Sequence, residues 1–324
     1  MNDRAAISMS VYRSVDDIPS GFGPSIAAIG NFDGVHRGHQ EILGSVVAEA
    51  RACGAQAVAV SFDPHPETVL RPAQAPKMLT PVSERLRLLA GTGVDSVVLL
   101  PFDRALAQVA PRDFVSRVLV DALSVRGLHE GGNFRFGHRA AAGVRELAEF
   151  GREFGFKVHV HTAVRVHGLE VSSSAVRELV AAGDMKRARW MLGRPFSVRS
   201  TPVRDRGVGT RLLVPTVNLA PYTGLLPASG IYVTRLTIGE RCFQGASYIG
   251  DRPTFEGAGF SVETHILDFE PIEMSENTPL QLDFLLRLRD DEKFPSPDAL
   301  KAQILKDVAK ARRYFELLAG SSRI

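Results

Sequence analysis

The chain has 324 residues, of which 44% are hydrophobic and 23% charged, with a formal net charge of +3. This length allows two domains of ordinary size, each with its own core. No apolar run of about 18 residues occurs, which excludes a membrane-spanning helix, and the dispersed Lys and Arg residues form no basic run of the kind that binds nucleic acid. A pI near 9.0 suits small phosphorylated ligands better.

The cysteines and the first residues indicate a cytoplasmic protein. Cys53 and Cys242 are too few for a disulfide framework or a structural zinc site. The first 17 residues mix acids and bases without the apolar centre of a signal peptide. We therefore expect a reducing compartment.

Short β-rich runs alternate with helical patterns from residue 25 to about 190. The expected strands are 25–30, 56–62, 94–102 and 157–164, and the expected helices are 38–53, 83–91, 111–125, 144–155 and 175–192. This alternation predicts a parallel sheet wrapped by helices.

The first helix has one apolar stripe, made of Ile42, Leu43, Val46, Val47 and Ala50. These spacings predict that the stripe packs on the sheet. We expect the opening turn, residues 36–39, to stay exposed at the carboxyl edge of a strand, which is where open α/β sheets bind ligands.

Strands without intervening helices follow from about residue 195. They are expected at 196–203, 230–238, 241–250, 260–269 and 279–288, and Gly239-Glu240 marks a hairpin. A closing helix over 296–318 has Ser296 as its N-cap and Pro297 at its first position. This half predicts an antiparallel barrel with a packed helix, and we place the domains at 1–188 and 189–324.

The segment GNFDGVHRGHQEIL, residues 30–43, combines glycines with two histidines where the first helix begins. A helix N-terminus offers unpaired N–H groups and a positive dipole end, and imidazoles donate hydrogen bonds to phosphate oxygens. Such a site stabilises phosphoryl or nucleotidyl transfer by positioning and electrostatics. The alternative, polar surface residues at a helix cap, is the commoner meaning of an isolated HxGH.

The flanking motifs decide between these two interpretations. Residues 30–43 resemble the nucleotide-binding motif of HxGH nucleotidyltransferases, and SFDPHP, LPFD, GGNFRFGHRAAAG and VSSSAVRELVAAGD follow in order. With them the chain resembles bacterial bifunctional riboflavin kinase/FAD synthetases. The resemblance implies a Rossmann-like α/β domain that adenylylates FMN with ATP.

The resemblance also implies a role for particular residues of this domain. Its catalytic residues would be His36, His39 and Arg177, and its ATP-binding residues Gly30, Asn31, Asp33, Gly38, Ser173 and Ser174. Asn133 and Phe136 would contact the flavin, since an aromatic face and an amide suit isoalloxazine. From the residues alone, the three at 173, 174 and 177 could simply be the N-cap and first turn of a helix, which is the commoner use of serine before an apolar pattern.

In the second half PTVN and VETHILDF, residues 215–218 and 262–269, resemble the two parts of the riboflavin kinase site. The resemblance implies that Thr216 and Asn218 hold Mg²⁺ and that Glu263 is the base for the ribityl hydroxyl. Without the motif, a glutamate in an alternating strand would be a solvent-facing residue.

The kinase motifs depart from the usual family pattern at Leu213, Val214, Val217 and Tyr248. The family usually has glycine, an aromatic residue, alanine and asparagine there. A leucine in place of glycine restricts the backbone, so we weigh a weakened kinase against neighbouring changes that compensate.

The leading hypothesis is a two-site enzyme: riboflavin plus ATP gives FMN, and FMN plus ATP gives FAD and pyrophosphate. The alternatives are an FAD synthetase with an inactive barrel, and a flavin-binding regulatory protein without turnover. We expect small-molecule substrates and Mg²⁺, no nucleic-acid or membrane partner, and leave a homo-oligomer open.

Overall fold

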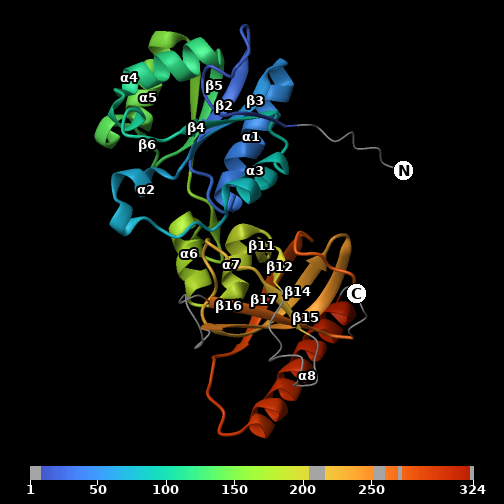
Figure 1. Ribbon diagram of the computed structural model, residues 1–324. Helices are drawn as coiled ribbons and strands as arrows, with labels where there is room; N and C mark the ends of the chain where they lie inside the picture. The colour runs from blue at the N-terminus through green and yellow to red at the C-terminus, as the bar shows by residue number, and fades with distance from the viewer. Residues whose placement is uncertain (1–8, 204–215, 252–259, 269–271, 322–324) are drawn as a thin grey trace. The chain divides into compact units, whose positions relative to one another are not determined.

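A computed structural model describes residues 9–203, 216–251, 260–268 and 272–321 (Figure 1). The chain forms two compact units, Met1–Ser173 and Ser174–Ile324. Within the described ranges, no helix is both long enough and apolar enough to cross a membrane.

The first unit is built on a parallel sheet, as predicted. Its six described strands are β1 (Ser10–Tyr12), β2 (Ser25–Ile29), β3 (Gln56–Asp63), β4 (Ser96–Pro101), β5 (Val125–Gly131) and β8 (Lys157–His161). They lie in the order β1-β4-β3-β2-β5-β8, and every neighbouring pair is parallel. The chain runs outward from β2 on one side and from β5 on the other, so a topological switch point lies between these strands.

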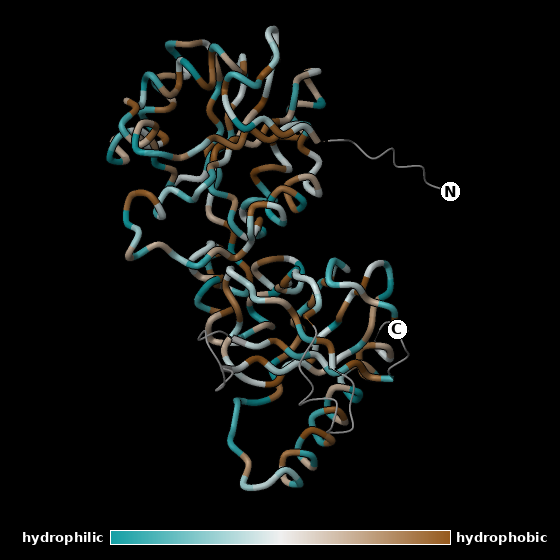
Figure 2. Tube along the Cα trace, in the orientation of Figure 1, coloured by the Kyte–Doolittle hydropathy of each residue, from teal (hydrophilic) through white to brown (hydrophobic). Residues whose placement is uncertain are grey.

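Helices cover both faces of this sheet (Figure 1). They are α1 (Arg37–Cys53) and α3 (Val82–Ala90) on one face, and α4 (Pro111–Phe114), the π-helical segment η3 (Val115–Ala122) and α5 (Val144–Phe154) on the other. Along β2, Ile26 and Ala28 face the first group and Ala27 and Ile29 the second. Because both faces are buried, β2 is a continuous apolar run rather than an alternating one, and Figure 2 shows such hydrophobic strands at the centre of this unit.

Shorter elements follow the ends of these strands. They are α2 (Pro66–Leu70), η1 (Pro72–Gln74), η2 (Leu106–Gln108), β6 (Arg135–Phe136), η4 (His138–Ala140), β7 (Ala142–Gly143), β9 (Arg165–Val166) and β10 (Leu169–Glu170). β6 pairs with β7 and β9 with β10, both antiparallel.

The single helix expected over 175–192 is wrong. It is two helices, α6 (Ser173–Ala181) and α7 (Met185–Leu192). Gly183 has φ of 76°, a left-handed conformation that glycine adopts at a helix end. The carboxylate of Asp184 then accepts the N–H of Arg187 at 3.0 Å and caps the second helix.

The second unit is an antiparallel half-barrel followed by a long helix. Its described strands are β11 (Phe196–Ser200), β12 (Pro202–Val203), β13 (Thr216–Leu219), β14 (Gly230–Ile238), β15 (Arg241–Asp251), β16 (Phe260–Ile266) and β17 (Leu280–Arg289). Their order is β11-β17-β14-β15-β16-β13-β12. The predicted hairpin is confirmed, since Ile238 pairs with Arg241 across the turn.

The closing helix α8 (Pro297–Ser321) begins as predicted. The hydroxyl of Ser296 accepts the N–H of Ala299 at 3.2 Å, which caps the first turn. Ala311 and Phe315 are buried against residues of β14, β15 and β17. The apolar stripe of α8 therefore completes the core on one face of the half-barrel.

Candidate active sites

Two cavities lie at the switch point of the parallel sheet, where β2 and β5 end. The larger, of about 960 Å³, is lined by aromatic residues and is called the aromatic cavity; it includes Phe62, Phe102, Phe134 and Phe136. The smaller, of about 570 Å³, includes His36, His39 and Ser173 and is called the histidine cavity. Ile29, Gly30, Asn133 and Phe134 border both, so the two spaces adjoin.

The two histidines of the HxGH motif stack on each other. Their ring centroids are 3.6 Å apart with an interplanar angle of 17°. His36 is the N-cap of α1, and its Nδ1 accepts the backbone N–H of His39 at 3.3 Å. A neutral His36 therefore carries its proton on Nε2, which makes that atom a hydrogen-bond donor. The expectation that this turn stays exposed is wrong for His36, which is only 6% exposed.

The imidazole of His39 is held neutral. Burial, and then the nearby His36, lower its pKa well below the ordinary value. Within the described structure its Nδ1 is buried without a hydrogen-bond partner. The ring of Phe32 packs edge-on against the imidazole, with the two ring centroids 5.2 Å apart. An anionic phosphate would favour the protonated ring.

Glycines shape the loop between β2 and α1. Gly34 has φ of 81°, a conformation that disfavours residues with a Cβ. A Cβ at Gly38 would lie 3.2 Å from the ring of His36, so the bare backbone lets that ring lie against the first turn of α1.

Asp33 points away from the cavity and into the protein. Its carboxylate accepts the N–H groups of Leu79 and Thr80, both at 2.9 Å, and it is 1% exposed. These bonds hold the loop before α3 against the HxGH loop. The predicted role of Asp33 in ATP binding stays a prediction, and its observed contacts are those of a positioning residue.

Asn31 lines the aromatic cavity. A buried arginine holds its backbone carbonyl. The guanidinium of Arg85 donates to the carbonyl of Asn31 at 2.9 Å and to that of Phe62 at 2.8 Å. Arg85 is 2% exposed. Burial lowers its pKa, although the negative charges of Asp33 and Asp63 act to raise it. One buried cation thus joins the ends of β2 and β3.

The two residues predicted to bind flavin both border the aromatic cavity. Asn133 is exposed there, whereas Phe136 is 9% exposed and belongs to the core cluster. Phe134 stacks on Phe136 with centroids 5.5 Å apart and is the more exposed ring. Phe134 therefore has at least as much ring surface available as Phe136.

Of the predicted ATP-binding residues Ser173 and Ser174 and the predicted catalytic residue Arg177, Ser173 has a described contact in the first unit. Its hydroxyl donates to the carbonyl of Asp33 at 2.9 Å, and it borders the histidine cavity. Ser174 and Arg177 lie on α6 in the second unit, exposed and half-buried respectively.

The predicted kinase residues come together on two paired strands. Asn218 of β13 lies opposite Glu263 of β16, and Thr216 lies opposite His265. Thr216 and Asn218 are two residues apart, so their side chains and that of Glu263 share one face of the sheet. The hydroxyl of Ser261 donates to the carboxylate of Glu263 at 3.1 Å.

Two of the departures from the family pattern, Val217 and Tyr248, lie on strands β13 and β15. Val217 is 4% exposed and points to the opposite, buried side of β13. Tyr248 lies opposite Glu263 on the other neighbouring strand, β15, and its hydroxyl donates to Asp291 at 3.0 Å. Leu213 and Val214 lie outside the described residues.

Comparison with known protein families now places both units. The FAD synthetase family matches residues 20–175, and the riboflavin kinase family matches residues 192–315. A bifunctional riboflavin kinase/FMN adenylyltransferase from Pseudomonas fluorescens is 35% identical over 94% of this chain and 97% of its own length. The chain belongs to this bifunctional family. The predicted boundary between residues 188 and 189 falls between the two matches and stays a prediction.

Another member of the family and one solved structure also match this chain over nearly its whole length. The bifunctional riboflavin kinase/FMN adenylyltransferase of Escherichia coli strain K12 is 34% identical over 90% of this chain and 93% of its own. A crystal structure described as a macrolide-efflux protein from Streptococcus pneumoniae superposes with a TM-score of 0.84, at 26% identity, over 94% of this chain and 98% of that one. Both units of the bifunctional fold are therefore present.

Two buried charged groups near the adenylyltransferase cavities were not predicted. Arg85 is one, and Glu130 of β5 is the other: it accepts the N–H of Ile29 at 2.6 Å and borders the histidine cavity. Burial raises the pKa of Glu130 well above its ordinary value, against the effect of the bond from Ile29. The available signal was an acidic residue in the strand segment VRGLHEG, separated by two glycines from the NFRFG motif.

Proposed function

We propose that the two reactions of this bifunctional enzyme are divided between its units, with FMN adenylylation at the switch-point cavities and riboflavin phosphorylation on the β13–β16 face. As a member of the family the chain is a riboflavin kinase and an FMN adenylyltransferase that converts riboflavin to FMN and FAD. The observation that carries the assignment is the stacked histidine pair at the start of α1, which lines a cavity in the unit matched by FAD synthetases.

In the adenylyltransferase site the protein positions the two substrates and stabilises the negative charge on their phosphates. The phosphate of FMN attacks the α-phosphorus of ATP, and pyrophosphate leaves. His36 donates through Nε2 to the phosphate oxygens on which charge develops, and His39 gains a proton as the anion approaches. No nucleophilic side chain is needed, since the substrate brings its own.

The adjoining cavities suit the two substrates of this step. We assign FMN to the aromatic cavity, where Asn133 and Phe134 or Phe136 meet the ring system, and the phosphates of ATP to the histidine cavity. The shared wall at Gly30 and Asn133 would let the two phosphate groups meet. Gly38 and Ser173 border the ATP side.

In the kinase site, Glu263 accepts the proton of the ribityl hydroxyl as that oxygen bonds to phosphorus. The neighbouring amide of Asn218 and hydroxyl of Thr216 orient the phosphates of ATP. These oxygen donors fit Mg²⁺, which prefers oxygen ligands and neutralises phosphate charge when bound. We assign the protein to the cytoplasm, in keeping with its substrates.

Product analysis by chromatography tests this assignment. With ATP and Mg²⁺, riboflavin should yield FMN and then FAD, and FMN should yield FAD. Conversion of FMN without conversion of riboflavin would contradict the assignment of riboflavin phosphorylation to the second unit. Flavin binding without any conversion would overturn the enzyme assignment.

A further inference from the structure

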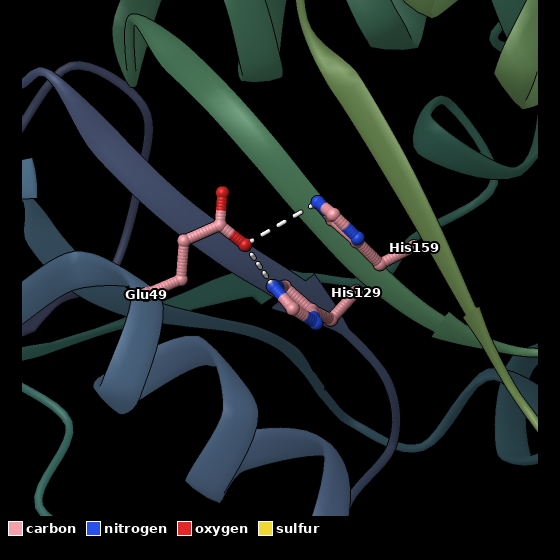
Figure 3. A group of neighbouring side chains, drawn as sticks. All are labelled: Glu49, His129 and His159. Atoms are coloured by element: carbon pink, nitrogen blue, oxygen red, sulfur yellow. Dashed lines mark hydrogen bonds and ion pairs between the residues drawn. The ribbon is translucent and has the colours of Figure 1, made fainter. Parts of the chain in front are cut away.

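Three side chains converge between α1 and the edge of the parallel sheet. They are Glu49 of α1, His129 of β5 and His159 of β8 (Figure 3). The two histidines lie opposite each other in the register of the paired strands, and their rings stack with centroids 4.6 Å apart. One oxygen of Glu49 lies 2.7 Å from Nε2 of His129 and 3.3 Å from Nε2 of His159.

An ordinary ion pair explains only part of this arrangement. The contact between Glu49 and His129 is a hydrogen bond, but Nε2 of His159 is a buried atom without a hydrogen-bond partner in the described structure. In the described part of the chain, the ion pairs of Glu49 are with these two histidines, and no Lys or Arg neutralises it. Glu49 is 30% exposed, and a half-buried carboxylate beside a buried, unsatisfied imidazole nitrogen is costly unless something joins them.

A cation would satisfy all three groups at once. The three ligand atoms lie within 4.8 Å of one another. Bonds of about 2.0–2.2 Å to zinc place neighbouring ligands of a tetrahedral site roughly 3.3–3.6 Å apart. The observed separations therefore need only small side-chain movements.

The surroundings also resemble those of metal centres. Nδ1 of His129 lies 2.9 Å from Nε2 of His161, so when Nε2 of His129 binds a metal, Nδ1–H can donate to His161 and fix the ring. A Cβ at residue 127 would lie 2.8 Å from Glu49, so Gly127 leaves room for the carboxylate against β5. The side chain of His159 is 43% exposed, which provides a path for entry.

We propose that Glu49, His129 and His159 form a binding site for a first-row transition cation of the Zn²⁺ class, with a water as fourth ligand and His161 as the group that orients His129. Two imidazoles and one carboxylate favour such a cation over Mg²⁺, which prefers oxygen ligands. This site is separate from the Mg²⁺ of the kinase reaction and does not depend on the proposed function.

Calorimetric titration of the metal-stripped full-length protein with ZnCl₂, without ATP or flavin, tests the site. We expect one equivalent of Zn²⁺ to bind, and excess Mg²⁺ not to displace it. Glu49→Gln and His159→Asn should each abolish this equivalent. His161→Asn should weaken it by about 10-fold to 100-fold, as loss of an orienting partner does.

Two control variants separate this site from other Zn²⁺ ligands. Cys53→Ser removes a thiol one turn further along α1, and His39→Asn breaks the other histidine pair; both should keep the equivalent. X-ray absorption at the zinc edge of the wild-type protein should show nitrogen and oxygen neighbours without sulfur. Absence of binding, sulfur ligation, or binding that survives in both Glu49→Gln and His159→Asn would overturn the proposal.

Discussion

Replacing Arg85 by methionine should destabilise the first unit and loosen its adenylyltransferase cavities. The guanidinium donates to two carbonyls, those of Asn31 and Phe62, at the ends of adjacent strands. Methionine keeps much of the apolar volume of the buried side chain but provides no donor. Both acceptors then lose their charged partner inside the protein.

The magnitude follows from the contacts of each carbonyl. A buried group left without a partner costs about 1–3 kcal/mol, so two would cost about 2–6 kcal/mol. The carbonyl of Asn31 keeps a longer bond, 3.3 Å, from the hydroxyl of Ser61, and the variant no longer buries the charge of Arg85. We therefore expect a loss of about 2–4 kcal/mol in the free energy of unfolding.

Hydrogen exchange in increasing urea measures this loss locally. Peptides covering residues 28–34 and 58–64 should exchange at lower urea in Arg85→Met, while peptides from β14 and β15 stay unchanged. Arg71→Met in the same unit is the control, because the side chains of Arg71 and Glu67 are 68% and 38% exposed and their 4.0 Å ion pair is worth at most about 1 kcal/mol. Equal urea dependence in the two variants would refute the reasoning.

Three further predictions concern the two sites. His39→Asn should lower FMN adenylylation by about 10²–10³-fold, as loss of one oriented donor does, and leave riboflavin phosphorylation intact; equal loss of both rates would contradict this. Glu263→Gln should lower riboflavin phosphorylation by about 10²–10⁴-fold, the contribution of a general base, while a change confined to FMN adenylylation would be the wrong outcome. Because the folded protein lowers the pKa of His39 below 6.5, the unfolded chain binds more protons in acid, so stability should fall as pH drops below about 6.5. Urea titrations of wild type and His39→Asn across this range should show a shallower fall in the variant, and parallel curves would exclude His39 as the cause.

The sequence was most informative where hydrophobic period and local chemistry agreed. The stripe on α1 includes Leu43, Val46 and Ala50, all fully buried, and the helix ends at Cys53 as expected. The cap of α8 by Ser296 was likewise predictable. In these segments the same residues decide both the local conformation and the packing.

Contacts between residues far apart in the sequence, and one helix break, could not be predicted from local sequence patterns. The helical periodicity on both sides of Gly183 hid the break between α6 and α7, which depends on one left-handed residue and one cap. Asp33 lies inside the HxGH motif, yet its carboxylate bonds to a loop 46 residues away. The opposition of Asn218 and Glu263 follows from strand register, and neither their spacing nor their surroundings in the sequence fixes that.

The cluster at Glu49 shows the same limit. Its members come from α1, β5 and β8: His129 lies 80 residues after Glu49 in the sequence, and His159 lies later still. The motif KVHVH places two histidines on one face of β8, but only the packing of α1 brings a carboxylate to the first of them, His159.

The most direct test of two separate sites in one chain follows the flavin products of two variants. His39→Asn and Glu263→Gln are each incubated with riboflavin, ATP and Mg²⁺, alone and mixed together, and the products are separated by chromatography. We predict that His39→Asn accumulates FMN, that Glu263→Gln leaves riboflavin unconverted, and that the mixture makes FAD. FAD formed at the wild-type rate by either variant alone would contradict the assignment.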